Sequence, residues 1–572
     1  MATRSEQLQN SKDVFKYPLR DMSQGAGNLS PRNANNEEED RDRERERYRD
    51  RDRASKYSTV CWHLSLVMLV TTIVIALMWT VYLSFDYYNC TPEQRFANMR
   101  KDFQVKERRR RLGGKLKLSP LEELANDRLL AIQKIDEDMH HIWDEYQPRP
   151  HYLTNYNINE TDLYSVLRNM PKGGLLHVHD LGMYRTDLLI NHTYQPDLWT
   201  CVAVNGVLED FRFSRSRPTV EPKGDYKCQW VLLNELRTLE KSAFEHKLRK
   251  SLTVDAHSFK NSTHLANHLK RANRLIEGLV SYRPFFPSFL MTMLEDFYTD
   301  GVNYVELRSS LPILYDLDDS NYTIWDTAYA FLVTTDMFRT SHEDFIGLKL
   351  IYAPEHDNND SKLRSYISNA RFLKSQFPNF VVGFDLVNFG DECQQLPLGT
   401  AVHLLHVSKE LDFYFHAGES RCRGNTPHAN LIDALLLGSK RIGNPINLPQ
   451  HPEVIRATKI LKIAAEVCPL SNYYLQSVND FGQHPAASLI AAGHPIVVGS
   501  DYPSFWNAAP LTDDFYITFV GIANGQANLR LLKQLAMNSF QFSAMNEDEK
   551  QKALHQWQCS WNHWVETFMG QS

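Results

Sequence analysis

The chain has 572 residues, of which 42% are hydrophobic, and its 63 Lys and Arg residues against 69 Asp and Glu residues leave a net charge of −6. This composition is ordinary for a globular protein, and it argues against a wholly disordered chain, a collagen-like sequence and a protein with several membrane spans. The charge balance predicts no nucleic-acid partner. The 8 cysteines, without C-x-x-C spacing, argue against a disulfide scaffold and a zinc ribbon.

Residues 1–57 are polar, with four acidic residues at 37–40 followed by alternating charge from Arg41 to Arg53. Such a segment buries too little apolar surface to offset the entropy that ordering costs. We therefore expect a disordered cytosolic tail or a solvated helix. Arginines that bind RNA or lipid are the alternative, which the interleaved Asp and Glu residues weaken.

Residues 60–85 contain no Asp, Glu, Lys or Arg and are mostly Val, Leu, Ile, Met and Trp. As a helix, about 20 such residues cross the hydrocarbon core of a membrane. Arg51, Arg53 and Lys56 precede the segment and Asp86 follows it, so the positive-inside rule predicts a signal anchor of a single-pass type II membrane protein. A buried core helix and a cleaved signal peptide are the alternatives, although the polar leader is too long for an ordinary signal peptide. Secretion after cleavage also stays open.

An extracellular location for the rest of the chain permits glycosylation and disulfides. Six Asn residues stand two positions before Ser or Thr and are candidate glycosylation sites: Asn89, Asn159, Asn191, Asn261, Asn321 and Asn359. Cys201 and Cys228 lie in a segment rich in Pro, Arg and aromatic residues, which predicts a disulfide that closes a loop. Two unpaired thiols are the alternative.

From residue 170 onwards, short apolar runs recur between stretches of helical character. The runs are Gly174–His179, Tyr304–Arg308, Leu348–Ala353, Val381–Val387, Phe413–Ala417, Arg441–Gly443, Glu466–Pro469 and Ile496–Ser500. Eight strands alternating with helices predict an α/β fold, with a TIM-type (β/α)8 barrel over residues 170–565 rather than an open doubly wound sheet. About 125 residues separate the first two runs, more than a simple crossover needs, so we expect an inserted subdomain there.

In such barrels, functional residues gather at the carboxyl ends of the strands. His177 and His179 close the first run, and alternate residues of a strand point to one face, so both imidazoles can face one ion. His416 closes the fifth run and Asp501 follows the eighth. An H-x-H pair alone is typical of surface or core histidines, but this set at three strand ends predicts a hydrolytic zinc site. Glu419 lies close enough to relay protons to the attacking water.

These segments also carry a resemblance. Six ordered motifs support it: Met170 to Asp180, Tyr304 to Arg308, Gly383 to Val387, His416 to Glu419, Cys468 to Asn472 and Gly493 to Asp501. They are similar to the adenosine deaminase-related growth factors, which are extracellular adenosine deaminases of the metallo-dependent hydrolase superfamily. The resemblance runs from residue 90 or so to the C-terminus and leaves out the tail and the membrane segment.

The resemblance implies a barrel with one zinc per subunit that converts adenosine or 2'-deoxyadenosine to the inosine product and ammonia. His177, His179, His416 and Asp501 match the family's zinc ligands by position, and Glu419 matches its proton-transferring acid.

The resemblance also implies how substrate and partners bind. Asp180 and His356 match residues that contact the nucleoside. Helices over residues 90–150 correspond to the region that builds a homodimer. The disulfide-bearing insertion, residues 192–250, corresponds to a module that binds a cell-surface receptor or a glycosaminoglycan.

Four residues depart from the family pattern. Asn444 replaces the histidine expected to orient the attacking hydroxide, and it cannot become a cation. Pro445 replaces a glycine, as does Asn388 where the backbone should approach the purine. Tyr502 replaces the carboxylate expected to hold the purine N7. Since the ligand set is complete, we predict retained zinc with impaired turnover. A catalytically inactive signalling protein and a barrel enzyme with another substrate are the alternatives.

Overall fold

The computed structural model describes most of the chain beyond residue 90. The described residues are 62, 64, 66–80, 91–140, 158–219, 227–240, 242–254, 262–318, 320–355, 360–387, 398–419, 429–523 and 525–570. The predicted tail, His356 and Asn388 lie outside them, and the predicted anchor lies only partly within them. The chain divides into Met1–Lys101 and Asp102–Ser572, and the second unit holds the features below unless stated otherwise.

Residues 66–80 of the predicted anchor are helical, and their large apolar side chains are exposed. Among the described residues, no helix combines the length and the apolar composition that a membrane crossing requires.

The predicted α/β fold with a parallel sheet is confirmed. Four parallel strands pair in the order β1-β5-β6-β7, and three more in the order β10-β9-β8. Their bounds are β1 Gly173–His179, β5 Val302–Ser309, β6 Gly347–Tyr352, β7 Val381–Phe384, β8 Arg441–Gly443, β9 Ala464–Val467 and β10 Ile496–Val498. These strands are buried and mostly apolar, as parallel strands covered by helices on both faces require.

Isolated bridges join the two sheets into a ring. Residue Phe413 pairs with Phe384 of β7, and His416 pairs with Gly443 of β8, while Val178 of β1 pairs with Asp501 beyond β10. All three bridges are parallel, so eight parallel segments follow one another in closed order. This ring places the carboxyl ends of all eight segments at one end of the barrel.

The fifth predicted run, Phe413–Ala417, forms these bridges but no regular strand. Two backbone N–H groups of this segment donate to side chains instead of to a neighbouring strand. The Phe415 N–H donates to Ser439 Oγ at 3.1 Å, and the His416 N–H donates to Asp385 Oδ1 at 3.3 Å. The run predicted at Glu466–Pro469 lies two residues earlier, because Pro469 begins a helix. The predicted strand ends at Val387 and Ser500 are also wrong, since β7 ends at Phe384 and β10 at Val498.

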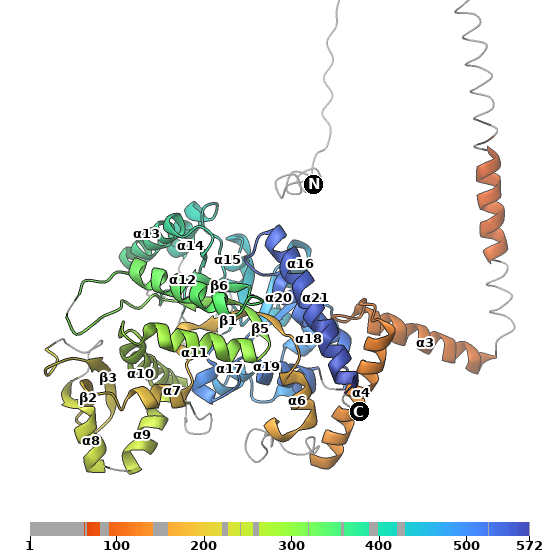
Figure 1. Ribbon diagram of the computed structural model, residues 1–572. Coiled ribbons are helices and arrows are strands. Elements are labelled where there is room, and N and C mark those ends of the chain that lie inside the picture. The colour runs from red at the N-terminus through yellow and green to blue at the C-terminus, as the bar shows by residue number, and fades with distance from the viewer. Residues whose placement is uncertain are drawn as a thin grey trace, which may run out of the picture. The chain divides into compact units, whose positions relative to one another are not determined.

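Helices alternate with the strands and cover the ring (Figure 1). Their bounds are α10 Ser262–Val280, α11 Phe286–Thr299, α12 Ile324–Ser341, α13 Asp360–Gln376, α14 Leu398–Val407, α15 Ala429–Leu436, α16 Pro452–Leu461, α17 Pro469–Tyr474, α18 Ala486–Ala491, α19 Thr512–Ile517, α20 Leu529–Gln541 and α21 Glu547–Gly570. Local sequence explains several starts: Thr323 and Asp326 form a capping box on α12, and Pro452 opens α16.

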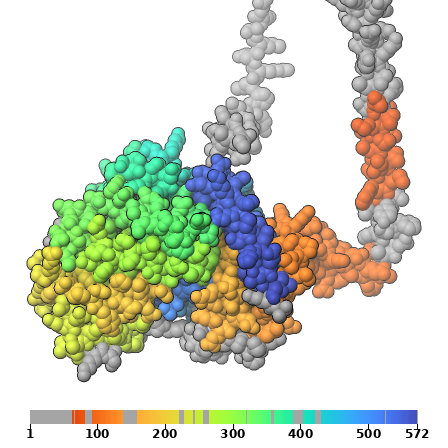
Figure 2. All heavy atoms as spheres, viewed as in Figure 1, coloured from red at the N-terminus to blue at the C-terminus, as the bar shows by residue number. Residues whose placement is uncertain are grey.

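The region predicted to be helical at residues 90–150 forms α3 (Pro92–Arg110) and α4 (Pro120–His140), and α6 (Asp162–Arg168) follows it. Helix α4 is fastened to the C-terminal helices. Glu122 accepts from Lys533 Nζ at 2.6 Å and from Trp561 Nε1 at 2.7 Å. Figure 2 shows the blue α21 lying beside the orange α4.

The expected insertion lies between β1 and β5. It contains α7 (Thr186–His192) and an antiparallel sheet of β2 (Leu198–Ala203), β3 (Leu208–Phe213) and β4 (Cys228–Leu232), followed by α8 (Leu233–Glu240) and α9 (Ser242–Leu252). The predicted disulfide is confirmed: Cys201 of β2 is bonded to Cys228 of β4. Helix α10 packs against β3, so the insertion contacts a helix that is followed by α11 and then by β5.

Candidate metal centre and adjoining cavity

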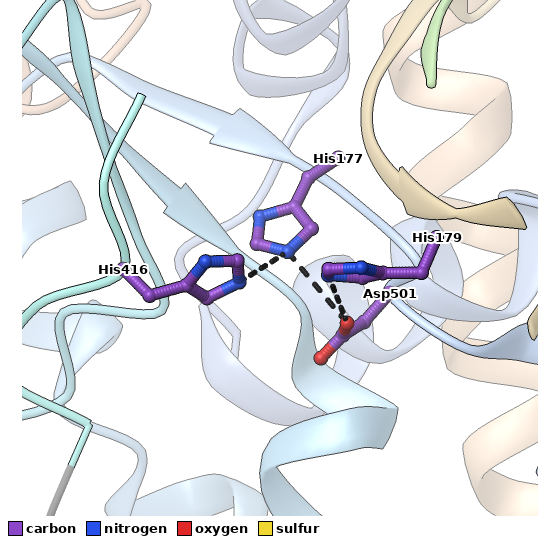
Figure 3. A group of neighbouring side chains, drawn as sticks. All are labelled: His177, His179, His416 and Asp501. Atoms are coloured by element: carbon purple, nitrogen blue, oxygen red, sulfur yellow. Dashed lines mark hydrogen bonds and ion pairs between the residues drawn. The ribbon is translucent and has the colours of Figure 1, made fainter. Parts of the chain in front are cut away.

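The four predicted metal ligands meet at the carboxyl end of the barrel. His177 and His179 come from β1, His416 from the segment that bridges β7 and β8, and Asp501 follows β10 (Figure 3). One ligand atom from each lies within 4.8 Å of the others. His177 and His179 reach the same point because alternate residues of a strand share a face.

Hydrogen bonds behind two of these histidines fix the direction of their lone pairs. His177 Nδ1 lies 2.7 Å from Glu466 Oε2, and His416 Nδ1 lies 2.8 Å from Asp385 Oδ2. Each Nδ1–H donates a hydrogen bond to a carboxylate, so each Nε2 points its lone pair into the cluster. The two Nε2 atoms are 3.0 Å apart. Their lone pairs repel each other at this distance, and a cation bound between them would remove the repulsion.

The remaining two ligands have polar atoms that lack a hydrogen-bond partner within the part of the chain that the structure describes. His179 Nε2 and Asp501 Oδ1 are buried without a hydrogen-bond partner among the described residues, although they lie 3.3 Å from each other. Buried polar atoms are rarely left unpaired. Three imidazoles and one carboxylate are a donor set that suits zinc, so these residues fit the ion that the sequence predicts.

Electrostatics at the cluster favour a bound cation. Burial lowers the pKa of His179 well below its ordinary value, so its ring is neutral. Burial alone would raise the pKa of Asp501, but the neighbouring His177 holds that pKa below its usual range. Burial also opposes protonation of His416, yet Asp385 and Glu419 outweigh it and raise the pKa of His416 to about 9. The negative potential that Asp385 and Glu419 produce would equally attract a metal ion.

A chain of buried ion pairs supports the two histidines from below. Arg308 joins both supporting carboxylates, at 2.9 Å to Asp385 and 2.7 Å to Glu466. Arg441 then joins Glu466 to Glu306, at 2.6 Å on each side. All five side chains are fully buried. Sequence reasoning quoted these residues only within motifs; charged residues inside otherwise apolar strands were the signal that could have revealed them.

Glu419 lies near the cluster, as predicted. Burial raises the pKa of its carboxyl, while the neighbouring His416 opposes the rise and Asp501 reinforces it. The side chain can therefore hold a proton at higher pH than an ordinary glutamate, which is what a proton-transferring group requires.

Asn444 does not point freely at the cavity but holds a metal ligand. Its Nδ2 donates to Asp501 Oδ2 at 3.1 Å, and its Oδ1 accepts from Asn472 Nδ2 at 3.1 Å. Asn472 Oδ1 lies 3.1 Å from His484 Nε2, and the Ala486 N–H donates to His484 Nδ1. The backbone donor fixes the proton of His484 on Nε2, so the direction of every bond in this relay is determined.

Tyr502 packs against the cluster from one side. Its ring stacks on His179, with centroids 4.5 Å apart and planes 4° apart, and on Phe505. The ring also fills the space beside Gly182, where an added Cβ would lie 2.2 Å from a ring carbon of Tyr502. The side chain is buried, so it narrows the site next to a metal ligand.

A cavity of about 370 Å³ opens beside the cluster, a size typical of small-molecule sites. It is lined by His179, Asp180, Leu181, Lys270, Asn273, Arg274, Glu277, Arg308, Ser310, Ala353, Glu355, Val387 and Tyr502. Asp180 accepts from Ser309 Oγ at 2.5 Å, and burial raises the pKa of its carboxyl to about 7. Sequence reasoning missed the contribution of α10 (residues 270, 273, 274 and 277), which no motif indicates.

Comparison with known proteins agrees with this arrangement. The family model for adenosine deaminase matches residues 251–558, and the model for the adenosine/AMP deaminase N-terminal region matches residues 75–167. An adenosine deaminase from Lutzomyia longipalpis is 36% identical over 490 residues, covering 83% of this chain and 94% of the relative. Adenosine deaminase 2 from Homo sapiens is 34% identical, covering 81% of this chain and 91% of the relative.

A solved structure supports the fold alone. The ligand-free N6-methyl-AMP deaminase from Arabidopsis thaliana aligns with a TM-score of 0.50 at 16% identity, covering 69% of this chain and 98% of that chain.

Proposed function

The chain belongs to the adenosine deaminase family, and on that premise we propose that it catalyses the zinc-dependent hydrolytic deamination of adenosine or 2'-deoxyadenosine to the inosine product and ammonia. The observation that carries this proposal is the cluster of His177, His179, His416 and Asp501, complete and directed at one point, at the wall of a cavity of about 370 Å³. Bound zinc would supply an activated water as the nucleophile.

The protein's own groups would position that chemistry. Glu419, with its raised pKa, would move a proton between the attacking water and the purine. Asp180 and Tyr502 line the cavity and would contact the nucleoside, together with His356 and Asn388. The hydrogen bonds that run from Asn472 through Asn444 to Asp501 would hold the Asp501 carboxylate in the orientation that binds the metal.

We propose that turnover is impaired. Asn444 stands where the family is expected to have a histidine, and its neutral amide would supply no cation to the transition state. Both ends of that amide are also engaged, by Asp501 and Asn472. Loss of one such polar stabiliser costs about 10²–10³-fold in turnover. Tyr502 adds a bulky ring against His179.

The second candidate function is that of a signalling or interaction protein, which would keep the zinc barrel but lack turnover. The Tyr502 ring stacked on a metal ligand favours it, because substrate must share that space. A barrel enzyme with another substrate is the third possibility, and the cavity residues of α10 favour it.

One experiment separates these functions. Purified full-length protein would be assayed for zinc content and for conversion of adenosine to inosine, with Glu419→Gln as the inactive control. We expect about one zinc per chain and slow, Glu419-dependent turnover. Rapid turnover at catalytic enzyme concentration would contradict impairment, and folded protein without zinc would refute the metal assignment. Zinc without any turnover would support the second function.

We also propose a type II membrane protein whose barrel is extracellular, with secretion after cleavage as the alternative. Exposed Asn159, Asn191 and Asn321 in sequons support this. Removal of N-glycans from the cellular protein should lower its apparent mass. An unchanged mass, with the barrel protected from protease added outside intact cells, would contradict the proposal.

We propose that α3 contributes to a homodimer. None of its residues is buried, and Phe96, Met99 and Phe103 are exposed at a spacing that places them on one face of the helix. A Phe96→Ser and Phe103→Ser variant should have the mass of a monomer in light scattering, whereas the wild type should have that of a dimer. Equal masses would contradict the assignment.

For residues 192–250 we propose a receptor-binding role. Two described cations of this region are already paired, Arg237 with Glu245 and Arg249 with Asp187, each at 2.6 Å. These two arginines have little to offer a polyanion, and we therefore propose a protein receptor, with a glycosaminoglycan as the alternative.

A further inference from the structure

The cavity beside the metal cluster has one wall that the ends of the barrel strands do not supply. That wall comes from α10, at Lys270, Asn273, Arg274 and Glu277. Residues at this spacing lie on one face of a helix. Helix α10 also contacts the turn Asp180–Gly182, which directly follows β1. This face of α10 therefore closes the cavity beside Asp180.

Asn273 is distinguished on this wall by its hydrogen bonding. Its side chain is buried, with the residue only 7% exposed. Both polar atoms of its amide, Nδ2 and Oδ1, are buried without a hydrogen-bond partner among the described residues. Buried amides are rarely left unpaired, because an unpaired donor or acceptor destabilises the folded state. An amide in this condition at the wall of a cavity indicates a contact to a bound molecule.

The charged side chains of the lining have partners within the protein. Arg274 Nη2 donates to Glu209 Oε2 at 2.9 Å, and Lys270 lies 3.5 Å from Glu355. Arg308 belongs to the buried chain of ion pairs below the metal ligands. The described lining also carries as many carboxyl groups as Lys and Arg side chains, so it offers no excess of positive charge to a phosphate group. A neutral sugar suits it better.

The proposed reaction decides which end of a nucleoside faces α10. The amino group that leaves adenosine is bonded to C6, so C6 must approach the metal ligands, of which His179 lines the cavity. The sugar is bonded to N9, on the opposite side of the purine. It therefore lies away from the metal ligands, where α10, which supplies none of them, can contact it.

We propose that Asn273 is a specificity-determining residue, which binds the 2'- and 3'-hydroxyl groups of adenosine and so selects adenosine over 2'-deoxyadenosine. An amide presents a donor and an acceptor side by side. Adjacent hydroxyl groups of ribose match this pair, since one can accept from Nδ2–H and the other can donate to Oδ1. The inference rests on the proposed deamination and narrows its substrate to the ribonucleoside.

Equilibrium binding to the full-length, zinc-loaded protein tests this assignment. Calorimetry in the Glu419→Gln background, where substrate is not consumed, would compare adenosine with 2'-deoxyadenosine and 3'-deoxyadenosine. A missing hydroxyl leaves one amide atom of Asn273 buried and unpaired, so each deoxynucleoside should bind at least about tenfold more weakly than adenosine. Asn273→Leu removes both amide atoms, so it should bind all three nucleosides within about threefold of one another.

A matched control and two further measurements separate a substrate contact from a structural role. Asn267 is exposed on the same helix and lies outside the lining, so Asn267→Leu should keep the preference for adenosine. Asn273→Leu should melt no lower than the wild type, because it replaces an unpaired buried amide by an apolar group. With Glu419 restored, Asn273→Leu should raise the KM for adenosine more than it lowers kcat, since the sugar contact exists before the reaction.

Three results would overturn the assignment. They are equal affinity of the unsubstituted Asn273 protein for the three nucleosides, a preference for adenosine that persists in Asn273→Leu, and a lower melting temperature of that variant with unchanged affinities. Tighter binding of adenosine 5'-monophosphate than of adenosine would also contradict it, because the lining would then recognise a phosphate. Failure of every nucleoside to bind would instead refute the proposed function on which the assignment rests.

Discussion

At the scale of single residues, Asn444 has a clear structural role beside Asp501. Its backbone is in the left-handed region, with a φ of 46°, which asparagine tolerates better than most residues. Its side chain accepts a hydrogen bond from Asn472 and donates one to Asp501. The side chain therefore orients Asp501, and through it would shape the proposed metal site.

The first prediction concerns reversal of two of the four expected departures from the family pattern, Asn444 and Tyr502. Asn444→His with Tyr502→Asp should raise the kcat for adenosine by about 10²-fold or more, because a general acid or base and a purine contact return together. Steady-state kinetics at matched zinc content measures it. Asn444→Ala is the control and should weaken zinc binding without any gain in kcat. No gain in the double variant would point to Asn388, Pro445 or another substrate.

His484, which no sequence motif singled out, begins the same hydrogen-bond relay. Burial lowers its pKa to about 3, so the folded state keeps the ring neutral where the unfolded chain, with a pKa of about 6.5, is protonated. The unfolded state then binds more protons below that pH. This contribution to the free energy of unfolding is thus complete above pH 6.5 and is lost progressively as the pH falls towards 3.

The second prediction follows from that sign. His484→Gln should cost about 1–3 kcal/mol near pH 7.5, because it leaves buried partners unpaired. The gap to the wild type should shrink by about 1.4 kcal/mol per pH unit below 6.5, since only the wild type loses stability by protonating this group. Urea denaturation at several pH values measures the gap. The exposed His555→Gln is the control, and a gap that stays constant for His484→Gln would refute the assignment.

At the scale of elements, the insertion is a small sheet stapled by one disulfide. The bond joins β2 to β4 across 27 residues, and α10 packs against β3. The metal ligands lie on other elements. The insertion should therefore loosen without disturbing the metal centre.

The third prediction tests this independence. Cys201→Ser with Cys228→Ser should destabilise the insertion by about 3–4 kcal/mol, the entropy of closing a loop of this length, and should speed tryptic cleavage within residues 192–250. Zinc content should stay at the wild-type level. Cys559→Ser, at an exposed free cysteine, is the matched control. Parallel loss of zinc would show that the insertion and the barrel unfold together.

At the scale of the whole molecule, the metal would act as a cross-link. Its ligands come from β1, from the segment between β7 and β8, and from the residue after β10, so one ion would tie opposite parts of the ring. Arg308 and Arg441 brace the same ring from within.

The fourth prediction is that chelation destabilises the barrel as a unit. A ligand present at about a thousandfold its Kd adds about 4 kcal/mol to the free energy of unfolding, so zinc removal should lower the melting temperature markedly. Calorimetry with and without a chelator measures the shift. His416→Ala should melt at the lower temperature and show no response, whereas His555→Ala should respond like the wild type. A shift that persists in His416→Ala would place the ion elsewhere.

Local sequence was sufficient for the strands and for the ligands of the metal centre. Apolar runs predicted nearly all the strands, because a strand covered on both faces must be apolar. His177 and His179 could be predicted as a pair because alternate residues of one strand share a face, which is a local property of the sequence. The Cys201–Cys228 disulfide followed from composition and spacing, although only the structure confirmed it.

Only the tertiary structure decided what surrounds those ligands. Arg308 meets Glu466, and Asn444 meets Asp501, through closure of the ring, which no local periodicity encodes. The same holds for the residues of α10 at the cavity. Sequence therefore determined which residues could bind a metal, whereas packing between distant segments determined how their protons, charges and neighbours are arranged.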